Sequence, residues 1–191
     1  MITNREHNHK MTAEEYLAWE AQQEFRHEYV DGEILAMTGG TLPHNDIALN
    51  LYTALRPHLR QRGCRVNVSD AKVQAWKNSR YFYPDLVVSC DPDDLQARDF
   101  IQHPKVIVEV LSPGTANYDR TKKLKYYRRI PSLQEYVLVD SEAIIVEVYR
   151  RREGKMWLYC EYEAGEAIAL ESIEFACAIE LLYEGVSFEP A

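Results

Sequence analysis

Hydrophobic residues recur along this chain with two spacings, one typical of helices and one typical of strands. Near the N-terminus, Thr12 followed three residues later by Glu15 is a capping-box pattern, which predicts a helix that continues to about Gln23. The segment 26–37 has apolar residues on both sides of Asp31-Gly32. This dipeptide favours a tight turn, so the segment is predicted to be a β-hairpin.

A second helix is predicted after the loop at Gly39 to Pro43. It begins near His44 or Asn45 and ends at Gly63, with Pro57 expected to kink it. The apolar positions that recur with helical spacing are Ile47, Leu51, Ala54, Leu55 and Leu59.

The rest of the chain alternates short apolar segments with turns. The predicted strands are 65–76, 81–90, 105–111, 135–140, 144–150, 156–162 and 167–170. A polar loop or short helix is expected over 91–103, and a basic helix over 117–129, which Pro131 ends. This order predicts an α+β (α/β-like) fold with a mixed central sheet, flanking helices and an antiparallel C-terminal meander. No repeat or linker divides the sequence, so residues 1–191 are expected to form one domain.

The composition is that of an ordinary globular protein, without an apolar stretch long enough for a membrane span or a signal peptide. The net charge of −8 argues against broad binding to phosphate backbones, but residues 120–129 contain three Lys and three Arg. The four cysteines have no metal-binding spacing, so they are expected to be reduced in a cytoplasmic protein. Cys90 and Cys177 are expected to be core residues.

Glu109 is the first candidate for chemistry, because it interrupts the apolar strand segment 106–111. An acid on the same face as Ile107 and Leu111 needs a partner, which is either a buried Lys or Arg or a bound cation.

Asp85 is the second candidate, since it follows Pro84 at the start of another apolar strand. Strands lie about 4.8 Å apart, so carboxylates on the same face of neighbouring strands can bind one divalent cation. Such a cation activates water and offsets the charge of a phosphoryl group. The backbone carbonyl of Val110 is a further candidate ligand.

A lysine beside these acids would polarise the attacking water or neutralise the phosphate. Position 111, two residues after Glu109 and on its face, is Leu. The basic helix offers Lys123 instead, because Asp119, Lys123 and Tyr127 share one helical face, whereas Lys122 is expected to be solvated. The alternative is that Asp119 and Lys123 form only a surface pair.

These motifs resemble the Uma-two family of restriction-endonuclease-like proteins, in the PD-(D/E)XK nuclease superfamily. The matching motifs are Glu15 to Leu17, Glu28 to Glu33, His44, Pro84-Asp85, Glu109 to Pro113, Asp119-Arg120, Lys123, Tyr127 and Glu135 to Asp140. The chain departs from the superfamily pattern at Leu111, where the pattern has lysine. The resemblance implies a sheet flanked by helices, a metal held by Asp85 and Glu109, and a lysine supplied from the helix by Lys123.

The leading hypothesis is therefore a Mg²⁺- or Mn²⁺-dependent endonuclease that hydrolyses DNA. A homodimer would suit symmetric cleavage of two strands. His44 is a further candidate as base or phosphate contact, and Glu28 as a third acid near the metal, although a helix-start role for His44 and a surface pair of Glu28 with Arg26 remain open. Ser112 and Thr115 are expected to contact a phosphate or to cap the helix. Two alternatives stay open: an inactive nucleic-acid- or protein-binding module on this fold, and a purely structural ion network.

Overall fold

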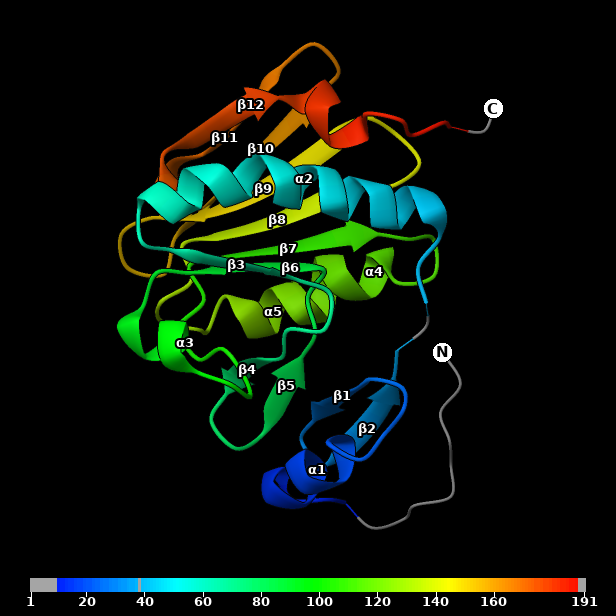
Figure 1. Ribbon diagram of the computed structural model, residues 1–191, viewed down its shortest axis with the longest axis vertical. Coiled ribbons are helices and arrows are strands. Elements are labelled where there is room, and N and C mark those ends of the chain that lie inside the picture. Colours follow the sequence, from blue (N-terminus) through cyan, green and yellow to red (C-terminus); the bar gives the residue numbers. More distant parts are fainter. Residues whose placement is uncertain (1–9, 38, 189–191) are drawn as a thin grey trace.

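The computed structural model describes residues 10–37 and 39–188, and its central element is a six-stranded mixed sheet (Figure 1). In sheet order the strands are β10 (Trp157–Glu163), β9 (Ile145–Arg151), β8 (Glu135–Asp140), β7 (Val106–Leu111), β6 (Leu86–Ser89) and β3 (Arg65–Val68). β7 and β8 pair in parallel, and the other neighbours pair antiparallel. The predicted α+β class, with a mixed sheet flanked by helices, is confirmed.

One face of this sheet is covered by the long helix α2 (Leu42–Gln61), which runs in nearly the same direction as the strands in Figure 1. The buried side of α2 presents Ile47, Leu51, Leu55 and Leu59 to the valines of β7 and its neighbours. The helix starts at Leu42, slightly earlier than predicted, because Thr41 is its N-cap, and it continues through Pro57.

The opposite face of the sheet packs against one helical segment made of α4 (Ala116–Tyr118), η1 (Asp119–Lys123) and α5 (Leu124–Tyr127). This segment confirms the predicted basic helix, but η1 is a π-helical turn that helical periodicity does not predict. Successive β7 side chains point to opposite faces. Val108 and Val110 therefore face α2, whereas Ile107 and Leu111 face the helical segment.

A four-stranded sheet lies beside this helical segment. Its order is β2 (Glu33–Ala36), β1 (His27–Val30), β5 (Arg80–Phe82) and β4 (Val73–Trp76). The predicted hairpin at Asp31-Gly32 is confirmed, and both residues have the positive φ that such a turn requires. Helix α1 (Ala13–Glu20), with the predicted capping box at Thr12, packs on this sheet through Tyr16, whose ring stacks on that of Tyr29 at 4.8 Å.

Two predicted strands, 65–76 and 81–90, are each divided between the two sheets. The first divides into β3 and β4, and the second into β5 and β6. Ser69, with a φ of 60°, ends the extended backbone of the first, and Pro84 has no N–H to donate in the second. The apolar positions change phase between Val68 and Ala71, and Pro84-Asp85 interrupts the second apolar run. These local signals do not show that the two parts of each segment join different sheets.

The predicted antiparallel C-terminal meander continues the main sheet only through β9 and β10. β11 (Ala167–Leu170) instead pairs with β12 (Phe175–Ala178) in a separate two-stranded sheet. The short helices α3 (Pro92–Gln96), η2 (Glu171–Ile173) and η3 (Ile179–Tyr183) complete the fold. None of the helices within residues 10–37 and 39–188 combines the length and the apolar composition needed to span a membrane.

The expectation of four reduced cysteines is wrong for one pair, because a disulfide joins Cys64 to Cys90. The antiparallel register of β3 and β6 pairs Arg65 with Ser89, so the next residues outward lie opposite each other. Cys90 is therefore half-buried at a strand end rather than in the core. Cys160 and Cys177 are free thiols.

The contact between α2 and the sheet predicts a large effect of shortening Leu55, which is fully buried. Leu55→Ala is expected to lower the free energy of unfolding by about 2–5 kcal/mol, because it removes apolar contacts and leaves a cavity. Urea denaturation followed by circular dichroism measures this change. Thr53→Ala, on the exposed side of the same helix, is the control and should change stability by less than about 0.5 kcal/mol.

Candidate active site

Glu109 lies in the middle of β7 on the face that packs against the helical segment, and only 4% of its surface is exposed. Its carboxylate oxygen Oε1 accepts hydrogen bonds from Lys123 Nζ at 3.1 Å and from the Tyr127 hydroxyl at 2.9 Å. The sequence argument that an acid at this position needs a partner is therefore confirmed, with Lys123 as the cationic partner.

Asp85 immediately precedes β6 and lies beside Glu109. β6 and β7 pair Leu86 with Val108, so continuing the register by one residue places Asp85 opposite Glu109. Asp85 Oδ2 accepts a hydrogen bond from the Val110 backbone N–H at 2.7 Å. The Asp85 side chain thus takes the position of a strand partner for β7 just before β6 begins.

Lys123 is buried, with 7% of its surface exposed, and its ammonium group lies among three carboxylates. Nζ is 3.1 Å from Glu28 Oε1, 3.1 Å from Glu109 Oε1 and 3.3 Å from Asp119 Oδ1. The alternative of a solvent-exposed Asp119–Lys123 pair is wrong, because both residues face the sheet. Glu28 pairs with Lys123 rather than with Arg26, which pairs with Asp70.

The π-helical turn η1 includes both Asp119 and Lys123. Its wider backbone ring directs the Asp119 carbonyl to the N–H of Leu124, five residues on, and the same carbonyl accepts a hydrogen bond from the Tyr136 hydroxyl at 3.2 Å. Single π-helical turns inside α-helices are frequent at functional sites. The sequence placed Asp119, Lys123 and Tyr127 on one helical face, but their complete burial depends on packing against β7 and β8.

Leu111, where the superfamily pattern has lysine, is a core residue. It is buried in the hydrophobic cluster between the main sheet and the helical segment, together with Tyr127 and Leu138. The ammonium group beside Glu109 comes instead from Lys123 on η1, as the sequence predicts. Lys122, the neighbouring candidate, is exposed, as expected.

The electrostatics of the cluster follow from burial and from an excess of acids. Burial raises the pKa of Glu109 well above its usual range, and Asp119, Asp85 and Glu28 raise it further, while Lys123 opposes this rise. The pKa of Glu28 is also raised, chiefly by burial. Four carboxyl groups thus share the cavity with one lysine and one histidine, so acids outnumber basic groups in the cluster.

The same acids act in the opposite direction on the lysine. Burial alone would lower the pKa of Lys123, but Glu109, Glu28 and Asp119 raise it well above its usual value. Lys123 therefore keeps its proton at neutral pH.

His44 lies in the first turn of α2 and points toward Asp85. Its Nε2 is 3.3 Å from Asp85 Oδ2, and its ring contacts the backbone at Gly40 so closely that an added Cβ there would lie 2.7 Å from Nδ1. Burial alone would lower the pKa of His44, but the interaction with Asp85 and a hydrogen bond to the Val110 backbone raise it.

The four acids of the cluster line one cavity of about 680 Å³, together with His44 and Lys123. Every predicted site residue is among its lining residues: Glu28, His44, Asp85, Glu109, Val110 and Lys123. Ser112 and Thr115 line it as well, and their hydroxyls lie 3.0 Å apart.

Sequence reasoning did not single out Tyr118, whose ring lines the cavity beside Lys123. Its position five residues before Lys123 was the available signal, but this spacing brings two side chains together only in a π-helical turn.

The donor set fits a hard divalent cation such as Mg²⁺ or Mn²⁺. Mg²⁺ binds oxygen ligands and commonly uses one or two carboxylates, with waters and phosphate oxygens completing its shell. Asp85 and Glu109 provide such carboxylates in the cavity. The hydrogen bonds that Lys123 and Tyr127 donate to Glu109 both go to Oε1. Among residues 10–37 and 39–188, no three His, Cys, Asp or Glu side chains form a complete metal-binding group. The fit is therefore to a two-carboxylate site.

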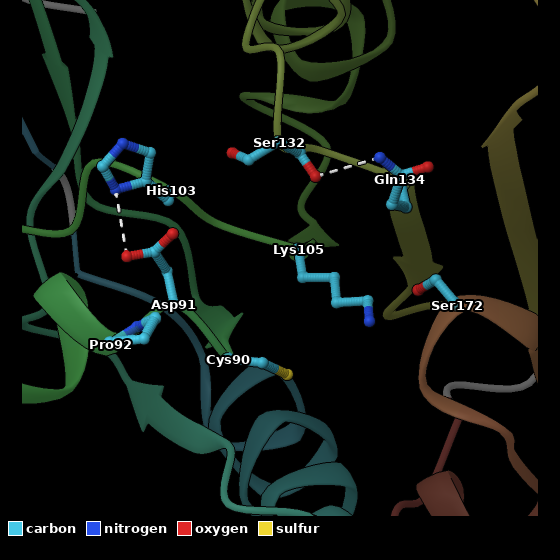
Figure 2. Close-up of a pocket in the computed structure, with 8 residues that line it drawn as sticks. All are labelled: Cys90, Asp91, Pro92, His103, Lys105, Ser132, Gln134 and Ser172. Carbon is cyan, nitrogen blue, oxygen red and sulfur yellow. Dashed lines mark hydrogen bonds and ion pairs between the residues drawn. The ribbon is translucent and has the colours of Figure 1, made fainter.

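A second cavity, of about 560 Å³, lies at the opposite end of β7 and is lined by none of the predicted site residues (Figure 2). Its polar groups interact with one another: His103 lies 3.6 Å from Asp91, and Gln134 donates to the Ser132 carbonyl. These contacts stabilise the strand ends, so the acid cluster around Lys123 is the better candidate for chemistry.

The arrangement around Lys123 predicts a strong effect on stability. Lys123→Met leaves three buried carboxylates without their cation, so the free energy of unfolding should fall by about 3–5 kcal/mol. Urea denaturation near neutral pH measures this loss. Lys122→Met, which changes an exposed neighbour in the same way, should cost less than about 0.5 kcal/mol. Equal effects of the two substitutions would contradict the buried network.

Comparisons with known proteins find matches over most of the chain. A family model described as "Putative restriction endonuclease", Uma2, matches residues 13–180. The uncharacterized protein slr1290 of Synechocystis sp. is 40% identical over 179 residues, which cover 94% of both chains. A second uncharacterized protein of the same organism, sll1609, is 34% identical over 153 residues, which cover 79% of this chain and 86% of the relative.

The fold also resembles a solved structure from Anabaena variabilis, described as a putative nuclease belonging to DUF820. The TM-score is 0.76 over 93% of this chain and 99% of that one, with 19% sequence identity, so this likeness concerns the fold alone. The family model covers most of the sequence, including every residue of the acid cluster and His44. The chain therefore belongs to the Uma2 family of restriction-endonuclease-like proteins.

Proposed function

We propose that this protein is a Mg²⁺- or Mn²⁺-dependent endonuclease that hydrolyses phosphodiester bonds of DNA. One observation supports this proposal most strongly. Asp85 and Glu109, from neighbouring strands, line the same cavity beside a buried lysine. Structural ion pairs do not require the excess of carboxylates found here, whereas such an excess can supply oxygen ligands for a divalent cation.

Asp85 and Glu109 would hold the cation, with the Val110 backbone carbonyl as a further ligand. A divalent cation at such a site supplies Lewis-acid stabilisation of the phosphoryl group and activates water for attack. The hydrogen bond from the Val110 N–H orients Asp85, and those from Lys123 and Tyr127 orient Glu109.

Lys123 has two functions in this proposal. Its ammonium group offsets part of the negative charge of Glu28, Glu109 and Asp119, which would otherwise repel an anionic phosphate. The same group provides a fixed positive charge at the cavity for the scissile phosphate or the attacking water. Both functions depend on the π-helical turn that directs Lys123 toward β7.

His44 completes the proposed machinery from the opposite side of Asp85. Its contact with Asp85 Oδ2 holds that carboxylate in place, and its ring lines the cavity where a phosphate oxygen would bind. A C2 homodimer of such sites would suit cleavage of both strands of a duplex.

A second candidate role is a structural ion network in a binding module without catalysis. The observation in its favour is that Lys123 already contacts three carboxylates, which leaves its charge largely compensated. Metal binding and cleavage distinguish the two candidates.

The proposal predicts cleavage of duplex DNA that requires Mg²⁺ or Mn²⁺ and stops in EDTA. Asp85→Asn and Glu109→Gln should each lower the cleavage rate at least about a hundredfold, because metal stabilisation of the transition state is worth several kcal/mol and each 1.36 kcal/mol is tenfold in rate. Gel-based cleavage kinetics measure the rates, and calorimetric titration with Mn²⁺ measures binding of the metal.

Asp46→Asn and Glu153→Gln are the matched controls, because both acids are exposed outside the cavity. These variants should cleave at the normal rate. Normal cleavage by folded Asp85→Asn or Glu109→Gln would refute the site assignment. A wild-type protein that neither binds Mn²⁺ nor cleaves DNA would favour the structural network.

A further inference from the structure

The surface of the helical segment that faces away from the sheet is strongly basic. Lys122 and Lys125 are exposed there, and Arg128 and Arg129 are exposed in the turn that follows α5, in a chain whose net charge is −8. We call these four residues the basic ridge. Asp119, the acid of η1, is on the buried side, so it does not neutralise the ridge.

The ridge cations differ from the other two basic residues of the segment, Arg120 and Lys123. Arg120 pairs with Glu147 at 2.7 Å and with Asp140 at 3.5 Å, and Lys123 is buried among acids. In the part of the chain that the structure describes, no carboxylate lies within ion-pair distance of a ridge side chain. Four neighbouring cations are therefore free to bind an external polyanion.

The ridge is continuous with the cavity. Tyr118 lines the cavity, and the Lys122 ammonium lies 5.8 Å from the centre of its ring. Lys122 and Lys125 lie three residues apart in the helical segment, and Arg128 and Arg129 follow directly after α5 ends at Tyr127.

We propose that the basic ridge binds the phosphate backbone of duplex DNA where the duplex extends beyond the cavity. This inference rests on the proposed nuclease function, because it assumes that the scissile phosphate lies at Asp85 and Glu109. The ridge provides positive charge outside the cavity, and the cavity itself is acidic. An acidic protein thereby confines its attraction for DNA to one side of one helix.

Contacts of lysine and arginine with phosphates release counterions, so the affinity falls as salt rises. The slope of log K against log salt is about −0.9 for each phosphate neutralised on duplex DNA. Four ridge contacts would therefore account for a slope of about −3.6. Removing two of them should make the slope less negative by about 1.8.

The test measures DNA binding in EDTA, so that no cleavage intervenes. Fluorescence anisotropy with a short labelled duplex gives the affinity of the full chain between about 50 and 200 mM KCl. Arg128→Ala/Arg129→Ala is the main variant, and Lys122→Ala/Lys125→Ala repeats the test on the other half of the ridge. We expect the slope of log K against log salt to be less negative by about 1.8 in each double variant. Each double variant should also bind DNA more weakly at low salt.

Arg56→Ala/Arg60→Ala is the matched control, because it removes the same two charges from exposed positions on α2, across the main sheet (Figure 1). Its slope should equal that of the wild type. An equal loss in this control would mean that net charge alone determines binding, and an unchanged slope in both ridge variants would also overturn the proposal. Circular dichroism and thermal melting verify that every variant is folded.

The ridge and the nuclease function can fail separately. If the wild type cleaves DNA with a metal and the ridge variants keep the wild-type salt slope, the proposal for the ridge is wrong. The proposal for the active site would then still stand. A reduced slope in the ridge variants without cleavage by the wild type would support the ridge as a DNA-binding surface and refute the nuclease.

Discussion

The ammonium group of Lys123 connects three parts of the molecule that are distant in sequence. It contacts Glu28 from the hairpin, Glu109 from the central strand β7 and Asp119 from its own helical segment. A charge buried this deeply is tolerated only when it is paired, and the same condition applies to each acid. The position of the hairpin against the main sheet is thus coupled to the chemistry of the cavity.

This coupling explains why the chain departs from regular structure at the site. A regular α-helix repeats every 3.6 residues, but the segment contains a π-helical turn between Asp119 and Lys123. β6 begins only after Asp85, so this carboxylate rather than a strand backbone accepts the hydrogen bond of the Val110 N–H. The π-helical turn and the late start of β6 both place polar side chains in the cavity. Regular elements would have backbone hydrogen bonds or apolar side chains at these positions.

Charge is also separated on the two sides of one helical segment. The side facing β7 bears Asp119 and the compensated Lys123, and the outward side bears the four cations of the basic ridge. This separation makes an acidic composition compatible with the proposed polyanionic substrate, because acids confined to a cavity would hold a metal while the basic ridge would attract phosphate. Net charge alone would have argued against such a substrate.

The sequence by itself determined the fold class, the hairpin at Asp31-Gly32, the long helix and the central strand with an acid that needs a partner. These features depend on local turn chemistry and on the alternation of apolar residues, which act over a few positions. It also placed Asp119, Lys123 and Tyr127 on one helical face. The tertiary structure alone decided that Glu28 reaches Lys123, that Cys64 lies opposite Cys90, that two apparently continuous strands divide between sheets, and that β11 leaves the main sheet. These features depend on contacts between residues far apart in the chain, which no local pattern of hydrophobic and polar positions encodes.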